Sequence, residues 1–113
     1  MMVSPDEKRQ DWPSHSLARV QELAREGKVN FTRSVQRDTK SLEYPPDEVF
    51  ECLAKLHADD FEESILYPDS PQWLDVYVTK WCRDSGTVDP LYIKFALSRS
   101  CLIVVLFSFH RPR

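Results

Sequence analysis

The residues best suited to chemistry lie at the end of the most apolar segment of this sequence. Residues 101–110 are rich in the β-branched and aromatic side chains that fit a pleated sheet, and they end in His110, which Arg111 follows. A continuous apolar run of this kind predicts a strand that is buried on both faces. An imidazole and a guanidinium at the tip of a rigid strand can bind a phosphate, so we expect an anion site at this edge of a sheet.

The segment before it adds further candidates. Residues 91–97 predict another strand, and because side chains alternate along a strand, Tyr92 and Lys94 share one face. Arg99 follows in a tight connection. Residues 78–113 hold six bases and two acids, whereas residues 45–77 hold nine acids and one base. This asymmetry is either ordinary variation of surface charge or a basic sheet edge that faces a polyanion, with an acidic side turned away.

Composition limits the possible classes of protein. At 113 residues, with 42% of them hydrophobic, the chain suits one domain with a packed core. Two glycines are too few for a glycine-rich phosphate loop. The scattered Cys52, Cys82 and Cys101 favour reduced core thiols in a cytoplasmic protein and argue against a zinc site. No apolar run approaches the roughly 18–20 residues of a membrane-spanning helix. We therefore expect no membrane segment, no metal and no cofactor.

The N-terminal part of the sequence predicts a polar arm and then a helix. Residues 1–13 contain two prolines and show no periodicity, so we expect a mobile arm followed by a single domain over residues 14–113. Ser14 or Ser16 can cap the first helix, whose apolar residues recur at helical spacing. Gly27 is the predicted stop of this helix.

The rest of the chain predicts an α+β fold. After a short extended link at residues 28–31, a second helix is predicted over residues 33–42. The third helix has an apolar stripe made of Val49, Phe50, Leu53 and Leu56. Four strands are then expected at residues 61–67, 72–81, 91–97 and 101–110. Helices followed by consecutive strands predict an antiparallel sheet with the helices on one side.

Six segments follow one another in an order that resembles one known family. The most specific is Trp73-Leu74-Asp75-Val76-Tyr77, preceded by Tyr67, which resembles the family's Trp-Gln-Asp-Val-Tyr. The other five are Leu17–Gly27, Phe31-Thr32-Arg33-Ser34, Asp60-Phe61-Glu62-Glu63-Ser64, Leu91-Tyr92-Ile93-Lys94, and Ile103-Val104-Val105 with Ser108-Phe109. Together they make the chain similar, over about residues 16–110, to the MqsR (motility quorum-sensing regulator) family of bacterial toxins.

The resemblance implies a fold and a function. The fold is like that of the RelE-type ribonuclease toxins, with helices packed on a curved antiparallel sheet of about four to six strands. The implied function is that of a toxin in a toxin–antitoxin pair, a metal-independent endoribonuclease that cleaves messenger RNA, with preference for a short GCU-type sequence, and inhibits growth. The implied partner is an antitoxin with a zinc-binding half and a helix-turn-helix half. Direct DNA binding by this chain alone is not expected.

The resemblance also points to site residues, with departures. The positions at which the family keeps an acting Lys, Gln, Tyr and Lys are Glu63, Leu74, Tyr92 and His110 here, so only the tyrosine is retained. We expect His110 to act as general acid or base and Glu63 to be its counterpart. The tyrosine hydroxyl would donate a hydrogen bond to the phosphate. The expected anion-binding residues are Lys94, Arg99 and Arg111.

Two alternatives stay open at this point. His110 lies three residues from the end of the chain and can be an ordinary solvated histidine, and Glu63 can simply face water. The loss of three of the four acting residues favours a second function as well. In that interpretation the chain is a decayed toxin, a non-catalytic module that binds RNA or an antitoxin.

Overall fold

The structure is a computed structural model, and it describes residues 7–113. Three helices and one 3₁₀ turn occupy mainly its first half: α1 (Leu17–Arg25), α2 (Arg33–Ser41), α3 (Pro46–Ala54) and η1 (Ala58–Asp60). Six strands make up the sheet: β1 (Lys8–Gln10), β2 (Val29–Phe31), β3 (Phe61–Leu66), β4 (Leu74–Cys82), β5 (Val88–Leu97) and β6 (Val104–His110). The predicted α+β class is confirmed.

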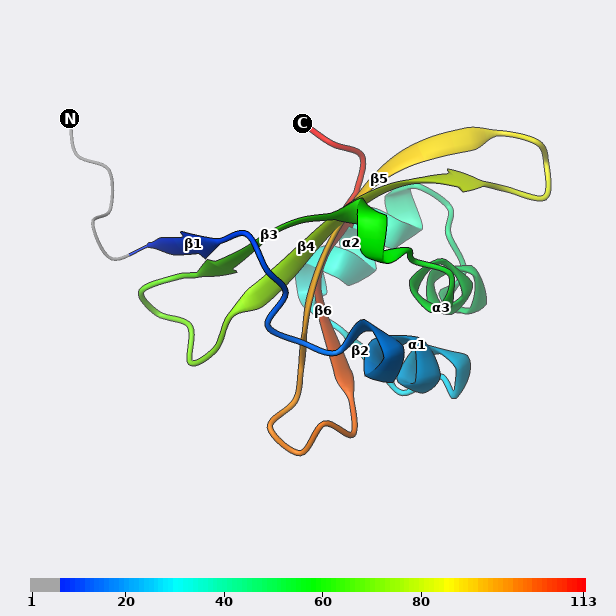
Figure 1. The fold of residues 1–113 in the computed structure, drawn as a ribbon. Helices are drawn as coiled ribbons and strands as arrows, with labels where there is room; N and C mark the ends of the chain where they lie inside the picture. The colour runs from blue at the N-terminus through cyan, green and yellow to red at the C-terminus, as the bar shows by residue number, and fades with distance from the viewer. Residues whose placement is uncertain (1–6) are drawn as a thin grey trace.

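The six strands form one open sheet in the order β1-β3-β4-β5-β6-β2 (Figure 1). All neighbours are antiparallel except β2 and β6, which pair in parallel. The segment at residues 28–31, expected as a short extended link, thus supplies an edge strand. The long β4–β5 hairpin extends past the other strands and curls over α3 (Figure 1). A curved, mostly antiparallel sheet of six strands agrees with the predicted four to six.

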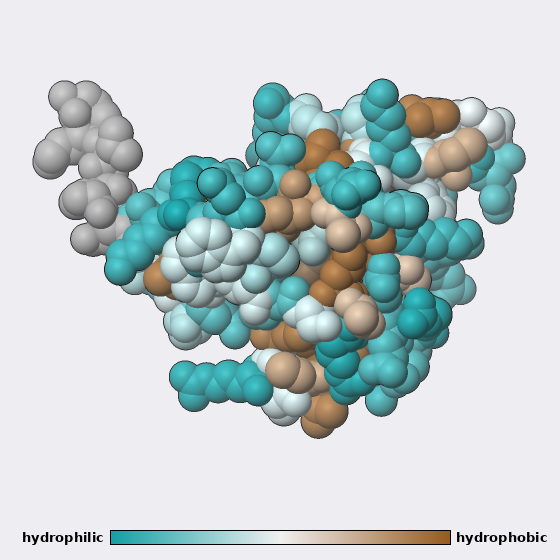
Figure 2. Space-filling model, in the orientation of Figure 1, coloured by the Kyte–Doolittle hydropathy of each residue, from teal (hydrophilic) through white to brown (hydrophobic). Residues whose placement is uncertain are grey.

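The helices all cover the same face of the sheet. Buried residues of α1, α2 and α3, among them Val20, Val35 and Leu53, join one apolar cluster with Ile93 and Phe95 of β5. The side of the molecule seen in Figure 2 is mostly hydrophilic, with hydrophobic residues gathered in a broken strip near the middle of the view. Because side chains alternate along β5, its residues between the core positions point to the opposite face, which the helices leave uncovered.

The ends of the first helix follow the sequence. The Ser16 hydroxyl accepts a hydrogen bond from the Arg19 amide, so Ser16 rather than Ser14 is the N-cap. Gly27 has a φ of 72°, and the Lys28 amide donates to the Leu23 carbonyl. This left-handed position favours glycine, and the predicted stop is confirmed.

The predicted closing strand is corrected in two respects. It begins at Val104 instead of residue 101, because Cys101 adopts a φ of 58° in the turn that precedes it. It is also buried on one face only, since the helices cover a single side of the sheet. A bulge falls in its middle: Lys94 pairs with Ser108 and Phe95 with Leu106, which leaves Phe107 without a partner.

The expected N-terminal arm contains a strand that the sequence does not predict. Lys8–Gln10 pair with β3 as the outermost strand, while residues 1–6 lie outside the described residues. Three consecutive polar residues carry no apolar periodicity, so a strand here depends on backbone pairing with a distant segment. The arm therefore belongs to the sheet at residues 8–10.

The buried carboxylate of Asp75 holds the segment that connects β1 to α1. Asp75 is fully buried and accepts hydrogen bonds from the Ser14 amide at 2.9 Å, the His15 amide at 2.9 Å and the Ser64 hydroxyl at 2.7 Å. The His15 ring makes a further contact with the segment that leads into β4, because its Nε2 donates a hydrogen bond to the Trp73 carbonyl at 2.8 Å. The residues around Asp75 thus hold the segment between β1 and α1 against β4.

Replacing Asp75 by alanine should destabilise the fold strongly. Three donors would lose their shared acceptor inside the protein, and we expect the free energy of unfolding to fall by about 3 kcal/mol. Urea unfolding followed by circular dichroism measures this change. The exposed Asp59 is the matched control, for which Asp59→Ala should change stability by less than about 0.5 kcal/mol. Equal unfolding midpoints for the two variants would contradict the role of Asp75.

Candidate functional site

The uncovered side of the sheet, called the open face here, collects most of the predicted site residues. Pairing places Tyr92 opposite His110, and Lys94 opposite Ser108, on β5 and β6. Val76 of β4 lies between Lys94 and Glu63 of β3 in the same row. Directly paired residues project from the same face of a sheet. Four of the six predicted site residues, His110, Tyr92, Lys94 and Glu63, therefore lie on the open face.

Tyr92 and His110 form a stacked pair at the end of the open face. Their ring centroids are 5.1 Å apart and the rings are nearly parallel, at 10°. The His110 Nδ1 lies 2.8 Å from the Arg111 carbonyl oxygen. A carbonyl oxygen only accepts hydrogen bonds, so Nδ1 carries the proton of the neutral ring. The Nε2 atom then keeps its lone pair, which is the state that a general base needs.

The Tyr92 hydroxyl stays protonated over a wide pH range. Burial is the main cause that raises the pKa of Tyr92, and the nearby Tyr67 and Glu63 raise it further. A neutral phenol next to the His110 ring is a hydrogen-bond donor, not a base. This state suits contact with an anionic oxygen.

Lys94 brings a positive charge to the same face of the sheet as the stacked pair. Its Nζ donates to the Tyr67 hydroxyl at 3.0 Å and lies 5.0 Å from the centre of that ring. Tyr67 follows β3 and was recognised in the sequence only through the family resemblance. The two contacts hold the ammonium over the open face, two residues along β5 from Tyr92.

Glu63 is engaged with a residue that the sequence did not single out. The Arg9 Nη1 donates to the Glu63 carboxylate at 2.6 Å, across the β1–β3 pair. Strands β4 and β5 separate Glu63 from His110, so the two residues do not touch. Arg9 lies in the expected arm, and a lone arginine in a polar segment gives no signal of this contact.

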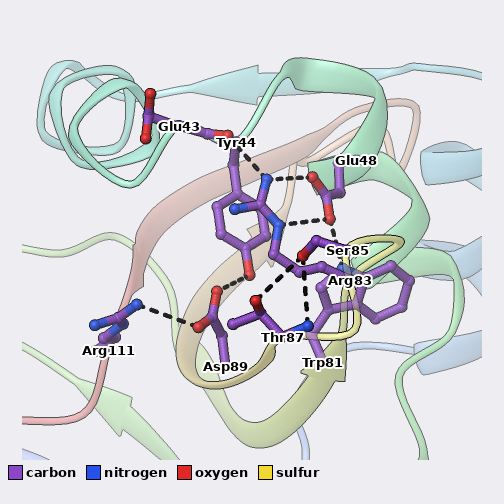
Figure 3. Close-up of polar contacts among 9 residues, drawn as sticks. All are labelled: Glu43, Tyr44, Glu48, Trp81, Arg83, Ser85, Thr87, Asp89 and Arg111. Atoms are coloured by element: carbon purple, nitrogen blue, oxygen red, sulfur yellow. Dashed lines mark hydrogen bonds and ion pairs between the residues drawn. The ribbon is translucent and has the colours of Figure 1, made fainter.

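Arg111 lies on the other side of the sheet from His110, because consecutive residues alternate between faces. Its Nη2 donates to the Asp89 carboxylate at 3.2 Å, and the same buried carboxylate accepts the Tyr44 hydroxyl at 2.6 Å (Figure 3). Arg111 therefore anchors the tail that follows His110. Its expected contact with a phosphate stays a prediction.

Arg99 is also away from the pair of rings. It is exposed in the connection that follows Leu97, and Leu97 pairs with Val104 next to the turn of the β5–β6 hairpin. The Tyr92–His110 pair lies at the opposite, open end of the same hairpin. The structure thus does not bring Arg99 to the other predicted site residues, and its role in phosphate binding stays a prediction.

A second polar cluster fixes the β4–β5 hairpin to α3 (Figure 3). The Arg83 guanidinium donates twice to the Glu48 carboxylate, at 2.7 and 3.1 Å, and the Trp81 ring N–H donates to it at 2.9 Å. The guanidinium also stacks 4.0 Å from the centre of the Tyr44 ring. Arg83 is the main cause that lowers the pKa of Glu48. All these groups are partnered, so the cluster has a structural role.

Two further observations concern the described part of the chain. Within residues 7–113, no set of three or more His, Cys, Asp and Glu side chains is arranged to hold a metal ion. Over the same residues, no helix combines the length and the apolar character that crossing a membrane requires.

Comparison with known proteins gives one finding that covers nearly the whole chain. A family model described as motility quorum-sensing regulator, toxin of MqsA, matches residues 12–111. No curated protein matches the chain. The matched range includes all the residues described above on β3 to β6, but it begins after Arg9.

The stability that Glu48 contributes should depend on pH. A carboxyl group with a lowered pKa stabilises the fold above its ordinary pKa of 4.5, and this contribution is lost as the pH falls through the folded-state pKa. We therefore expect Glu48→Gln to destabilise the protein at neutral pH, and the difference from the wild type to shrink below about pH 4.5.

Urea unfolding of both proteins at neutral pH and at steps down to about pH 3 measures this difference. Glu51→Gln, on the exposed side of the same helix, is the control and should have a small effect throughout. A difference between wild type and Glu48→Gln that stays constant over this range would show that the carboxylate charge does not matter.

Proposed function

Because the chain belongs to the family of motility quorum-sensing regulator toxins, we propose that it is an endoribonuclease that cleaves messenger RNA without a metal ion. The family makes it the toxin of a toxin–antitoxin pair. Cleavage and the resulting growth inhibition are our proposal. The stacked Tyr92–His110 pair, with Lys94 on the same open face two residues along β5, is the observation that carries it.

The first step uses the 2′-hydroxyl of the RNA as nucleophile. The Nε2 atom of His110 takes the hydroxyl proton while the 2′ oxygen attacks the adjacent phosphorus. The hydrogen bond between Nδ1 and the Arg111 carbonyl supports this role, since it fixes the ring orientation and leaves Nε2 as the acceptor. The new bond joins the 2′ oxygen to phosphorus and gives a 2′,3′-cyclic phosphate.

The second requirement is to stabilise charge and to release the 5′ oxygen. The Tyr92 hydroxyl, kept protonated by its raised pKa, donates to a non-bridging phosphate oxygen. The Lys94 ammonium neutralises the charge that develops on the phosphate and gives a proton to the leaving 5′ oxygen. The bond from phosphorus to that oxygen breaks, so the second product ends in a 5′-hydroxyl.

At Glu63, which occupies the family's lysine position, a positive charge is supplied by Arg9 of β1. The Arg9 guanidinium lies against the Glu63 carboxylate, and the hydrogen bonds to Glu63 and Glu7 raise the pKa of Arg9, so it stays charged. We propose that Glu63 acts by holding Arg9 at the border of the open face. For the counterpart role first expected of Glu63, both Glu63 and His110 would have to reach the same phosphate across two intervening strands.

A second candidate function is a non-catalytic module that binds RNA or an antitoxin. One observation favours it: Leu74, at the family's glutamine position, is 5% exposed and apolar, so it offers no polar group to a substrate. Expression in a bacterial host, with and without the neighbouring reading frame, discriminates the two functions. Toxicity that the neighbour relieves supports the nuclease, whereas growth without inhibition supports the module.

The partners follow from the same proposal. We propose messenger RNA as substrate and, as partner, an antitoxin of the type with a zinc-binding half and a helix-turn-helix half. DNA contact would then be made by the antitoxin and not by this chain. Such a pair would act in the cytoplasm, where messenger RNA is translated.

Replacing His110 by alanine should abolish most RNA cleavage. Loss of a general base lowers the rate by about 10²- to 10⁴-fold, and Tyr92→Phe should lower it as well by removing one donor to the phosphate. The rate is measured with purified protein and single-stranded RNA in the presence of EDTA. His57→Ala is the matched control, because His57 is exposed at the start of η1. Unchanged cleavage by His110→Ala would refute the assignment of the base.

A further inference from the structure

A hollow of about 440 Å³ lies on the open face next to Lys94. Its walls include two aromatic rings, Tyr67 and Phe107, and the apolar side chain of Leu74. Asp69, Ser70 and Gln72 add polar groups to the lining, next to Lys94. This volume falls within the range of about 300–1,000 Å³ that is usual for small-molecule sites. An apolar lining with a few polar groups is also typical of such sites.

The walls of this hollow are held in place before any ligand arrives. Phe107 is the unpaired residue of the β-bulge, and the bulge turns its ring to the open face beside Lys94. The Tyr67 hydroxyl is fixed by the Lys94 ammonium at 3.0 Å. The Gln72 side-chain N–H₂ group donates to the Leu97 carbonyl at 3.0 Å, which leaves its carbonyl oxygen as an acceptor. The site therefore has fixed aromatic and acceptor groups.

We propose that this hollow binds one unpaired nucleobase of the RNA, next to the phosphate held by Lys94 and Tyr92. The inference rests on the proposed function and deepens it by assigning a base subsite. A nucleobase presents a flat π-face to an aromatic ring and N–H donors on its edge. The rings of Tyr67 and Phe107 match the first property, and the acceptor oxygens of Asp69 and Gln72 match the second.

The shared position of Lys94 argues for a nucleotide rather than an uncharged ligand. Its ammonium lines the hollow and also lies two residues from Tyr92 on the same strand face. A ligand that joins a flat base to a phosphate can occupy the hollow and reach the stacked rings of Tyr92 and His110. Base recognition and phosphate contact would thus be supplied by neighbouring groups of one face.

The test measures RNA affinity in the His110→Ala background, so that the RNA stays intact. In this background we expect Phe107→Ala to raise the Kd for a short single-stranded RNA by about 5- to 150-fold, the effect of losing one stacked base. The dependence of Kd on salt should stay the same, because stacking releases no counterions. Lys94→Gln should instead reduce that dependence. Phe107→Tyr should keep the affinity, and Phe107→Leu, which preserves apolar bulk, should lose it.

Leu102→Ala is the control, since Leu102 is apolar, 56% exposed and located in the β5–β6 connection. Unchanged RNA affinity in both Phe107→Ala and Phe107→Leu would overturn the base subsite. So would a loss of affinity accompanied by a changed salt dependence, or a loss of antitoxin binding with RNA affinity unchanged. If the wild-type protein binds RNA in a manner that depends on Phe107 but does not cleave it, the proposed nuclease activity alone is refuted. If the protein cleaves RNA and Phe107→Ala leaves both cleavage and RNA affinity unchanged, the proposed base subsite alone is refuted.

Discussion

Three short helices must bury their apolar residues on a single face of the sheet. Each has nine residues, which is too short to be stable alone in water, so packing against β4, β5 and β6 is what supports it. One face of the sheet is thereby filled with apolar side chains. The other face mixes the aliphatic side chains of Ile65, Leu74 and Val76 with polar and aromatic residues, and the groups to which we assign a role toward RNA under the proposed function lie there. The packing of the helices thus decides where a substrate can bind.

Strand alternation then divides neighbouring residues between structure and chemistry. Phe109 is buried under the helices, His110 stacks on Tyr92 at the open face, and Arg111 returns to the helix side, where it meets the buried carboxylate of Asp89. The residues before and after His110 are therefore both anchored on the helix side of the sheet, Phe109 by burial and Arg111 by its contact with Asp89. These contacts restrain the position of His110 at the end of β6.

Local signals in the sequence were sufficient to predict the helices, four of the strands and the shared face of Tyr92 and Lys94. Helical and strand periodicities can be read from neighbouring residues, which is why these predictions succeeded. They were insufficient where distant segments meet. Strand β1, the Arg9–Glu63 pair and the amides held by Asp75 join residues more than 50 positions apart. The bulge at Phe107 and the parallel pairing of β2 also depend on register. Arg111 was expected beside His110, and alternation across the sheet separates them.

The chemical nature of the RNA products distinguishes attack by the 2′-hydroxyl from other routes of cleavage. Purified protein is incubated in EDTA with a single-stranded RNA that contains varied sequences, and the product ends are identified by mass spectrometry. We expect 2′,3′-cyclic phosphate and 5′-hydroxyl ends, with no cleavage of the same sequences as 2′-deoxy strands. Products with 3′-hydroxyl and 5′-phosphate ends, or cleavage of the deoxy strands, would contradict attack by the 2′-hydroxyl on the open face.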